Sequence, residues 1–460
     1  LKKKGIDWTR ESNGEAALPS DRVRASVALQ AERGGLRAGE TAKLKLTVTN
    51  VGDTVAHQVR AMSDSDNPSF DEREFFVGKV GPGETKSAVV EVSVRASEIT
   101  RADRVDLDIL TSRGVADITG ARPSLDIESI GLPRPSFSYG YQIIDDPTIS
   151  DDIVGNGDGA LQLGERVQLR AAVKNDGEGA SLDTWVHLRS FSGDAVFIHE
   201  GRENLKKLET DKSATASLDF EIRNKPADGV AKLSLTVTDN EIGEYLAEKF
   251  EIVVHPESVD FQDTRGSVTL PDGADLLGSP LGEPLKIASV PPKSTLPVTG
   301  QADGWLRVQL KDRPAFVSSE GLAVQSGRAR RSTPHTLHYA ISPPQVEVVG
   351  RVSQTDKDHI AISGSAIGEH GVKDLFITVV NPSRDLFARR EKVFFQAAED
   401  ASAARLDFAA TIPLTPGNNL IEIHARKDED VVGTHRMWVL STDGLEEARA
   451  QERERVAQAR

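Results

Sequence analysis

The chain has 460 residues, of which 38% are hydrophobic and 28% charged, and its net charge is −15. This composition is typical of a globular protein with roughly two to four domains, because one core rarely serves so long a chain. The acidic balance argues against a nucleic-acid-binding protein, and no apolar run approaches the roughly 18 residues of a membrane span. Cysteine is absent, which excludes thiol catalysis and thiolate metal sites but leaves the compartment open.

The first residue is Leu1 rather than Met, so we expect the sequence to be part of a longer protein. Residues 1–19 are then a remnant or linker that follows an upstream domain. The sequence could begin at Leu1 because of proteolysis or because of an artificially chosen boundary, and both explanations remain open.

Segments that alternate apolar with polar residues dominate the next part of the chain. Alternation with period two buries one face of a strand and exposes the other, as in antiparallel sheets. Examples are AKLKLTVTN, SAVVEVSV, RVQLRAAVKN and ASLDFEI. Amphipathic helices are almost missing, so the sequence predicts an all-β protein.

One phrase occurs twice. LRAGETAKLKLTVTNVGDT (Leu36–Thr54) and LQLGERVQLRAAVKNDGEG (Leu161–Gly179) agree at Leu, Gly, Glu, Leu, Val, Asn and Gly. In each, a Gly-Glu turn leads into a strand that ends at Asn-x-Gly, where Asn and Gly suit a turn. The repeat predicts tandem immunoglobulin-like β-sandwiches at 20–130 and 135–256.

The length and composition of the predicted strands change after this repeat. Short strands with many Pro and Gly residues predict a small SH3-like β-barrel at 261–328, followed by a linker at 329–344. Longer strands then predict another immunoglobulin-like sandwich at 345–441. Residues 442–460 are rich in Glu, Arg and Ala without an apolar stripe, which predicts a polar, solvated helical tail.

The sequence shows no catalytic residues, because no Gly-x-Ser-x-Gly elbow or other nucleophile–base pattern is visible. One stretch, DDIVGNGDGALQLGE, has acidic and amide side chains near the spacing of a calcium loop. The residues predicted to bind calcium are Asp151, Asp152, Asn156, Asp158 and Glu165. The first ligand position of such a loop is occupied here by Val154, which has no oxygen in its side chain. In the first repeat, Glu40 occupies the place of Glu165 although no Asp or Asn ligands precede it. A simple turn therefore remains the alternative.

Trp305 is the other candidate binding residue. It precedes a strand in GWLRVQLKDRPAFV, where it would stack on a sugar or peptide, or simply pack against the barrel.

Three parts of the chain resemble known families. The twin phrases resemble CARDB-type immunoglobulin-like modules of bacterial surface proteins. The stretch with Trp305 resembles a bacterial Src-homology-type barrel, although Ala315 and Phe316 stand where that family often has Gly-Trp. The last unit, with IPLTPGNNLIEIHARKDEDVVGTHRMWVL, is similar to the final domain of long carboxyl-terminal processing serine peptidases, and LKKKGIDW resembles the segment that closes their protease core.

This resemblance implies a non-catalytic accessory region of an envelope serine peptidase, which spaces, docks, regulates or selects substrates for an upstream protease core. The catalytic Ser and Lys would lie upstream. The alternative is a stand-alone extracytoplasmic adhesion or cell-wall scaffold that binds peptidoglycan or another envelope protein. Both interpretations place the chain in the periplasm or cell envelope of a bacterium.

Overall fold

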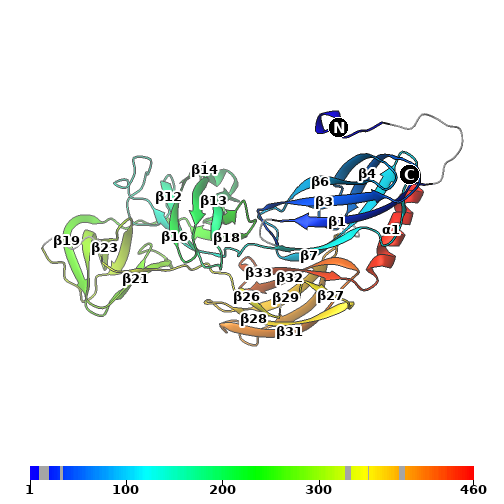
Figure 1. Cartoon of the computed structure of the whole chain (residues 1–460). Coiled ribbons are helices and arrows are strands. Elements are labelled where there is room, and N and C mark those ends of the chain that lie inside the picture. The colour runs from blue at the N-terminus through cyan, green and yellow to red at the C-terminus, as the bar shows by residue number, and fades with distance from the viewer. Residues whose placement is uncertain (10–19, 32–34, 327–332, 351, 383–388, 460) are drawn as a thin grey trace.

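The structure is a computed structural model that describes residues 1–9, 20–31, 35–326, 333–350, 352–382 and 389–459. Within these ranges the regular elements are strands, apart from the 3₁₀ turns η1 (Lys2–Lys4) and η2 (Gly193–Ala195) and the helix α1 (Leu445–Ala459). Three pairs of packed sheets and one curled sheet make up the molecule (Figure 1). The prediction of an all-β fold, with sandwiches and a small barrel before the last of them, is confirmed, and the sheet of the small unit is curled into a half-barrel. No described helix has the length and apolarity that a membrane crossing requires.

The first sandwich is built from alternating strands, as the sequence predicts. Its strands are β1 (Arg22–Gln30), β2 (Leu36–Arg37), β3 (Thr41–Asn50), β4 (Ala56–Asp64), β5 (Glu74–Val80), β6 (Thr85–Ser93), β7 (Arg101–Thr111), β8 (Gly114–Val115), β9 (Asp117–Ile118) and β10 (Ser124–Ile130). One sheet has the order β6-β3-β1-β9 and the other β2-β10-β7-β4-β5, with β8 on β7. Leu44, Leu46 and Val48 of β3 point into the core and are fully buried.

The second sandwich repeats this arrangement. Its strands are β11 (Phe137–Ile144), β12 (Arg166–Asn175), β13 (Ser181–Ser190), β14 (Val196–Glu200), β15 (Arg202–Leu208), β16 (Ser213–Ile222), β17 (Val230–Asp239) and β18 (Tyr245–Val253). The sheets have the orders β11-β12-β16-β14 and β15-β13-β17-β18. Leu169 and Val173, the counterparts of Leu44 and Val48, are likewise fully buried.

The curled sheet follows and contains β19 (Gln262–Leu270), β20 (Ala274–Leu277), β21 (Lys286–Val290), β22 (Ser294–Ala302), β23 (Trp305–Gln309), β24 (Pro314–Ser318) and β25 (Thr336–Leu337). Their order is β19-β22-β23-β24-β20-β21-β25. The strand β25 comes from the predicted linker, of which residues 329–332 lie outside the described part of the chain. The residues that follow β25 lie against the second sandwich, where Ile341 and Tyr139 form two backbone hydrogen bonds with each other (2.8 and 3.0 Å).

The last sandwich contains β26 (Gln345–Val349), β27 (Gln354–Thr355), β28 (His359–Ile367), β29 (Asp374–Val380), β30 (Glu391–Ala397), β31 (Arg405–Pro413), β32 (Gly417–Arg426) and β33 (Val432–Ser441). Its sheets have the orders β26-β28-β31 and β27-β33-β32-β29-β30. Each sandwich has seven main strands if the short or additional strands β2, β8, β9, β14 and β27 are left out. When these seven are numbered in chain order within each sandwich, strands 1, 2 and 5 form one sheet and strands 4, 3, 6 and 7 form the other. The last unit is therefore a third copy of the same topology.

The phrase shared by the first two sandwiches has a structural explanation. Asn50 donates from Nδ2 to the carbonyl oxygens of Thr54 and Val80, and its Oδ1 accepts from Gly52 N. Asn175 makes the same three contacts, with Gly179, Leu208 and Gly177. Both asparagines are buried, so each satisfies backbone groups that water cannot reach.

The three sandwiches contact one another pairwise and form what we call the sandwich ring (Figure 1). The first and last are joined where Arg101 lies over the Trp438 ring (4.3 Å) and Asn418 Nδ2 donates to Asp103 (3.0 Å). The second and last are joined by Val431, which is fully buried in the core of the second. The first and second are joined through Arg134 of the connection between them.

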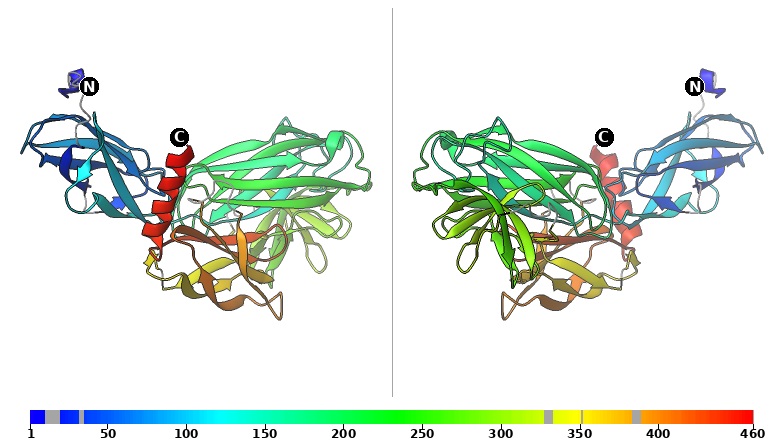
Figure 2. Two further views of the ribbon diagram at one scale, coloured as in Figure 1. Left: turned by 90° about the vertical axis from the view of Figure 1, so that its right-hand side faces the viewer. Right: turned by 90° about the vertical axis from the view of Figure 1, so that its left-hand side faces the viewer.

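The carboxyl-terminal helix differs from the expectation of a wholly solvated tail. Leu445 and Arg449 are buried, and the Arg449 guanidinium donates to Asp106 of the first sandwich (2.6 Å). Figure 2 shows α1 running beside that sandwich. Arg449 also pairs with Asp66 (3.7 Å), and Glu446 with Arg104 (3.1 Å). Ion pairs and one leucine thus dock the helix, so no apolar stripe is needed.

Candidate functional site

A cleft lies between the three members of the sandwich ring. It has a volume of about 980 Å³ and is lined by all three sandwiches and by residues 131–135, which connect the first to the second. A cleft of this size at an interface between domains is a usual place for a ligand or a peptide segment. It is therefore the candidate functional site.

A chain of alternating charges forms one wall of this cleft. Arg134 of the connection pairs with Glu244 of the second sandwich. Glu244 also accepts two hydrogen bonds from Arg436 of the last sandwich, both at 3.2 Å. Arg436 in turn donates to Glu422 (3.2 Å), which also accepts from Arg390 (2.6 Å).

These ion pairs are partly buried, which makes them stronger than pairs on an open surface. Burial alone would lower the pKa of Arg436, but the carboxylates of Glu244 and Glu422 outweigh it and raise that pKa. Arg134 additionally donates to the carbonyl oxygens of Ser97 (3.2 Å) and Ile242 (2.7 Å). One guanidinium thus holds the first and second sandwiches at a fixed relative position.

An aromatic floor continues from this wall on the outer face of the sheet that contains β29 and β32. The rings of Phe376 and His424 are stacked at 4.7 Å, and His424 Nδ1 lies 3.0 Å from Thr434 Oγ1. Burial lowers the pKa of His424, while Glu422 acts in the opposite direction. At neutral pH this floor presents a neutral imidazole and apolar rings beside arginines, which suits contact with a polypeptide.

A second feature joins the second sandwich to the curled sheet, and it contains most of the predicted calcium residues. The carboxylate of Asp145 accepts backbone hydrogen bonds from Gly157 (2.8 Å), Asp158 (3.0 Å) and Gly159 (2.8 Å). The carboxylate of Asp158 accepts from Ala160 and, across the junction, from Val259, both at 2.9 Å. The loop is folded around these two carboxylates.

Each predicted calcium residue has a place in this loop. Asp151 is exposed, and Asp152 pairs with Arg166 (3.1 Å). Asn156 accepts from the amide of Asp158 (2.9 Å). Glu165 accepts from Gln162 N (2.9 Å), as Glu40 does from Arg37 N (3.3 Å). The five side chains are thus distributed along the loop, and the described residues contain no group of three or more acidic or histidine side chains arranged to hold a metal.

Burial raises the pKa of Asp145 to about 6, against the lowering effect of its amide donors. Burial likewise raises the pKa of Glu165 to about 7, and the charges of Asp145 and Asp158 add to this. Calcium binding by the loop stays a prediction from the sequence, whereas its contacts identify a structural clasp between two modules.

Asp145 was missed by the sequence analysis. The only available signal was its position directly after the strand β11 and before a glycine-rich loop. Gly155 and Gly159 are needed there, because a Cβ on Gly155 would lie 2.3 Å from the carbonyl oxygen of Asp145 and one on Gly159 would lie 2.1 Å from that of Gly278.

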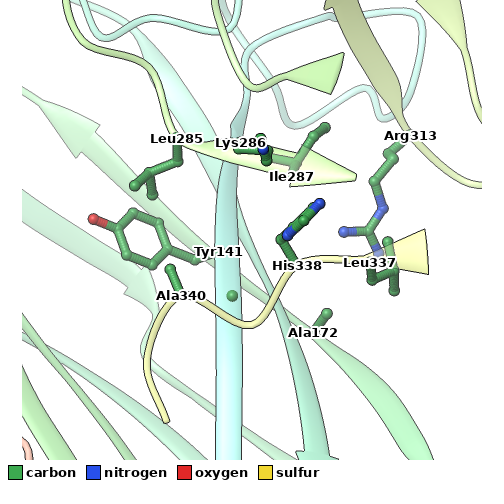
Figure 3. A pocket seen from close by; sticks show the side chains of 10 residues that line it. Tyr141, Ala172, Leu285, Lys286, Ile287, Arg313, Leu337, His338 and Ala340 are labelled. Carbon is green, nitrogen blue, oxygen red and sulfur yellow. The ribbon is translucent and has the colours of Figure 1, made fainter. Parts of the chain in front are cut away.

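The small pocket in Figure 3 lies at the same junction, between Tyr141 and Ala172 of the second sandwich and Ile287 and His338 of the curled sheet and its return segment. Its volume is about 10 Å³, which suffices for little more than one water molecule. Arg313 lies at its edge and donates to Asp312 (3.0 Å). The pocket is a small gap in the packing between the second sandwich and the curled sheet.

Trp305 lies at the start of β23, where it is half-buried and pairs with Ala302 across the hairpin. Its predicted role in binding stays a prediction. Phe316 is fully buried and packs on Phe261 (5.4 Å between centroids), so its ring contributes to the clasp between modules.

The acidic and aromatic stretch Ser63–Phe76 also joins two sandwiches. Asp66 accepts a hydrogen bond from Asn418 N (3.2 Å), and Asn67 donates to Asp103 (2.8 Å). Phe70 and Phe75 are fully buried in the first sandwich. Part of this loop is therefore an interface to another sandwich of the same chain.

Neither the models of known protein families nor the sequences of curated proteins match this chain. Among solved structures, the chain is distantly similar to a Salmonella alpha-2-macroglobulin mutant, with 11% identity and a TM-score of 0.22 over 92% of this chain and 33% of that one. An elastase-activated Escherichia coli alpha-2-macroglobulin gives 9% identity and 0.17 over 91% and 44%. A red sea bream transglutaminase gives 12% identity and 0.19 over 51% and 32%.

The chain thus spans about a third of the length of the first of these structures. The similarity concerns β-rich domains and assigns no activity to this chain.

Proposed function

We propose that this chain is a non-catalytic docking region of an envelope carboxyl-terminal processing serine peptidase. In this proposal the sandwich ring is a rigid platform, and its central cleft receives an extended polypeptide on its way to an upstream catalytic core. The observation that carries the proposal is the charge wall from Arg134 through Glu244 and Arg436 to Glu422, because it fixes three modules around one cleft.

A rigid platform differs physically from a flexible string of modules. Domain interfaces within one chain are usually small and allow motion unless buried contacts hold them. Here Val431 is fully buried in a neighbouring sandwich, and Arg101 and Asp103 are almost fully buried at another interface. Such contacts favour a spacer that presents its cleft in a fixed direction.

The support for a peptidase connection comes from the resemblance of the last unit and of LKKKGIDW to that family. The segment that resembles the end of a protease core contacts the first sandwich, since Lys79 N donates to Asp7 O (2.9 Å). While this segment is bound, a preceding domain would lie close to the first sandwich.

The proposal is tested by expressing the chain together with a Ser/Lys peptidase core of that family and measuring cleavage of an unfolded reporter with an apolar carboxyl terminus. We expect the chain to bind the core and to change the cleavage rate, and Arg436→Met to weaken the change in rate. A matched control is Arg223→Met, which removes an exposed arginine of the second sandwich. The proposal fails if the chain neither binds the core nor alters cleavage.

Retention on peptidoglycan would indicate the alternative, a cell-wall scaffold. Retention that is lost in Trp305→Ala, with no effect on any peptidase, would replace the proposed function by that one.

A further inference from the structure

The amino-terminal residues lie against the free edge of the first sandwich, at β5. Ile6 and Trp8 are half-buried, whereas Asp7 and Thr9 are exposed, so the segment alternates like a strand. The Trp8 ring meets Phe76 edge-on at 5.5 Å between centroids. The segment thus uses two side chains, two positions apart, to contact the edge.

The edge itself is shaped to accept a segment. The pairing of β4 with β5 shifts register around Val59, and Gln58 adopts a positive φ of 52° there. This bulge directs two side chains to the segment: Gln58 Nε2 donates to Trp8 O (3.2 Å), and His57 Nδ1 donates to Thr9 O (3.2 Å). Bulges are a common means of redirecting side chains at sheet edges.

Gly78 completes the site. Its φ is +88°, and a Cβ at this position would lie 2.6 Å from Asp7 O and 2.8 Å from Ile6 Cγ2. Only glycine leaves room for the backbone of the segment, and the neighbouring amide of Lys79 then donates to Asp7 O (2.9 Å). The edge therefore combines a backbone donor, two side-chain donors and an aromatic face.

The contact is small compared with a complete strand pairing. Lys79 to Asp7 is one backbone hydrogen bond, whereas β1 and β3 pair over eight residues. An occupant held by so few bonds exchanges readily, and a free edge can pair with another extended peptide.

We propose that the bulged edge of β5 is a docking site for an extended peptide that carries an aliphatic and an aromatic residue two positions apart, and that Ile6–Thr9 is its releasable intramolecular occupant. The proposal is independent of any connection with a peptidase. It predicts that the site becomes accessible to an added peptide when the resident segment is weakened.

The test uses the full chain and a labelled synthetic peptide with the sequence of residues 1–9, LKKKGIDWT, followed by fluorescence anisotropy. In the unmodified chain, the resident segment competes with the added peptide at an effective concentration on the order of millimolar. Trp8→Ala removes the aromatic anchor of this competitor. We therefore expect the Trp8→Ala chain to bind the peptide about fivefold more tightly than the unmodified chain. Trp305→Ala, which removes a distant tryptophan, is expected to bind like the unmodified chain.

Two further variants locate the bound peptide. Phe76→Ala in the Trp8→Ala background is expected to abolish binding, because it removes the aromatic face. His57→Ala in the same background deletes only the bond to Thr9 O and is expected to weaken binding about fivefold without affecting the core of the sandwich. Equal binding to the unmodified and Trp8→Ala chains would overturn the proposal, as would unchanged binding after either edge substitution.

Discussion

Replacing Val431 by alanine is expected to loosen the last sandwich from the second without unfolding either. Val431 is fully buried, and its neighbours belong to the core of the second sandwich rather than to its own. The substitution removes two methyl groups, each worth about 0.8 kcal/mol, and leaves a cavity, so the contact should weaken by about 2 kcal/mol. This corresponds to about a 30-fold increase in the population of the open state.

Hydrogen exchange measures this opening directly, because the hydrogen bonds between Tyr139 and Ile341 lie in the same core cluster as Val431. Their amides should lose about 30-fold of their protection, while the amides of β28 and β31 in the last sandwich keep theirs. Val349→Ala is the matched control, since Val349 belongs to the same sandwich but is 70% exposed. Unchanged protection at Tyr139 and Ile341 in Val431→Ala would refute the reasoning.

Three further predictions concern polar and charged side chains. Asn175→Ala should destabilise the second sandwich by about 3 kcal/mol in chemical denaturation, because Gly179 O and Leu208 O lose their buried donor. Arg436→Met should lower the stability of the contact between the second and last sandwiches by about 1–2 kcal/mol, and less so at high salt, since the guanidinium is partly exposed. The clasp should lose thermal stability as the pH rises from about 4 to about 7, because the carboxyl groups of Asp145 and Glu165 hold their protons more tightly in the folded protein.

Asn224→Ala, at an exposed asparagine, should leave stability within about 0.5 kcal/mol of the unmodified chain, and an equal loss in both variants would contradict the role of Asn175. A salt-independent effect of Arg436→Met would contradict its ionic contribution. Asp145→Asn should flatten the pH profile of the melting temperature. Stability that rises with pH would contradict the raised pKa values of Asp145 and Glu165. A melting temperature at pH 8 that calcium raises and a chelator lowers would show that the clasp binds a cation.

The parts of this fold that depend on local patterns could be predicted from the sequence. Alternation places Leu44 and Leu169 in their cores, and the shared Asn-x-Gly phrase corresponds to the identical bonds of Asn50 and Asn175. The alternation and the bonds of each asparagine to its own turn lie within one strand and that turn, so a short window of sequence is enough to predict them. The bonds to Val80 O and Leu208 O reach another strand and are outside such a window.

The assembly of the modules could not be predicted in this way. Arg134, Glu244 and Arg436 are far apart in the chain, and each alone is indistinguishable from a solvated surface charge. Asp145 bonds the amides of a loop more than ten residues later, and α1 docks through Arg449 rather than through an apolar stripe. Interfaces made of single polar contacts have no periodicity for a sequence analysis to detect.

The sandwich ring is tested most directly by cross-linking across its first and last members. Glu128 and Ser353 lie on these two sandwiches, with 3.2 Å between Ser353 Oγ and a carboxylate oxygen of Glu128, and the natural chain has no cysteine. In Glu128→Cys/Ser353→Cys, a short bismaleimide should link the two thiols rapidly within one molecule, at a rate independent of protein concentration. Linking that is slow, or as efficient between separate single-cysteine chains, would contradict a closed ring.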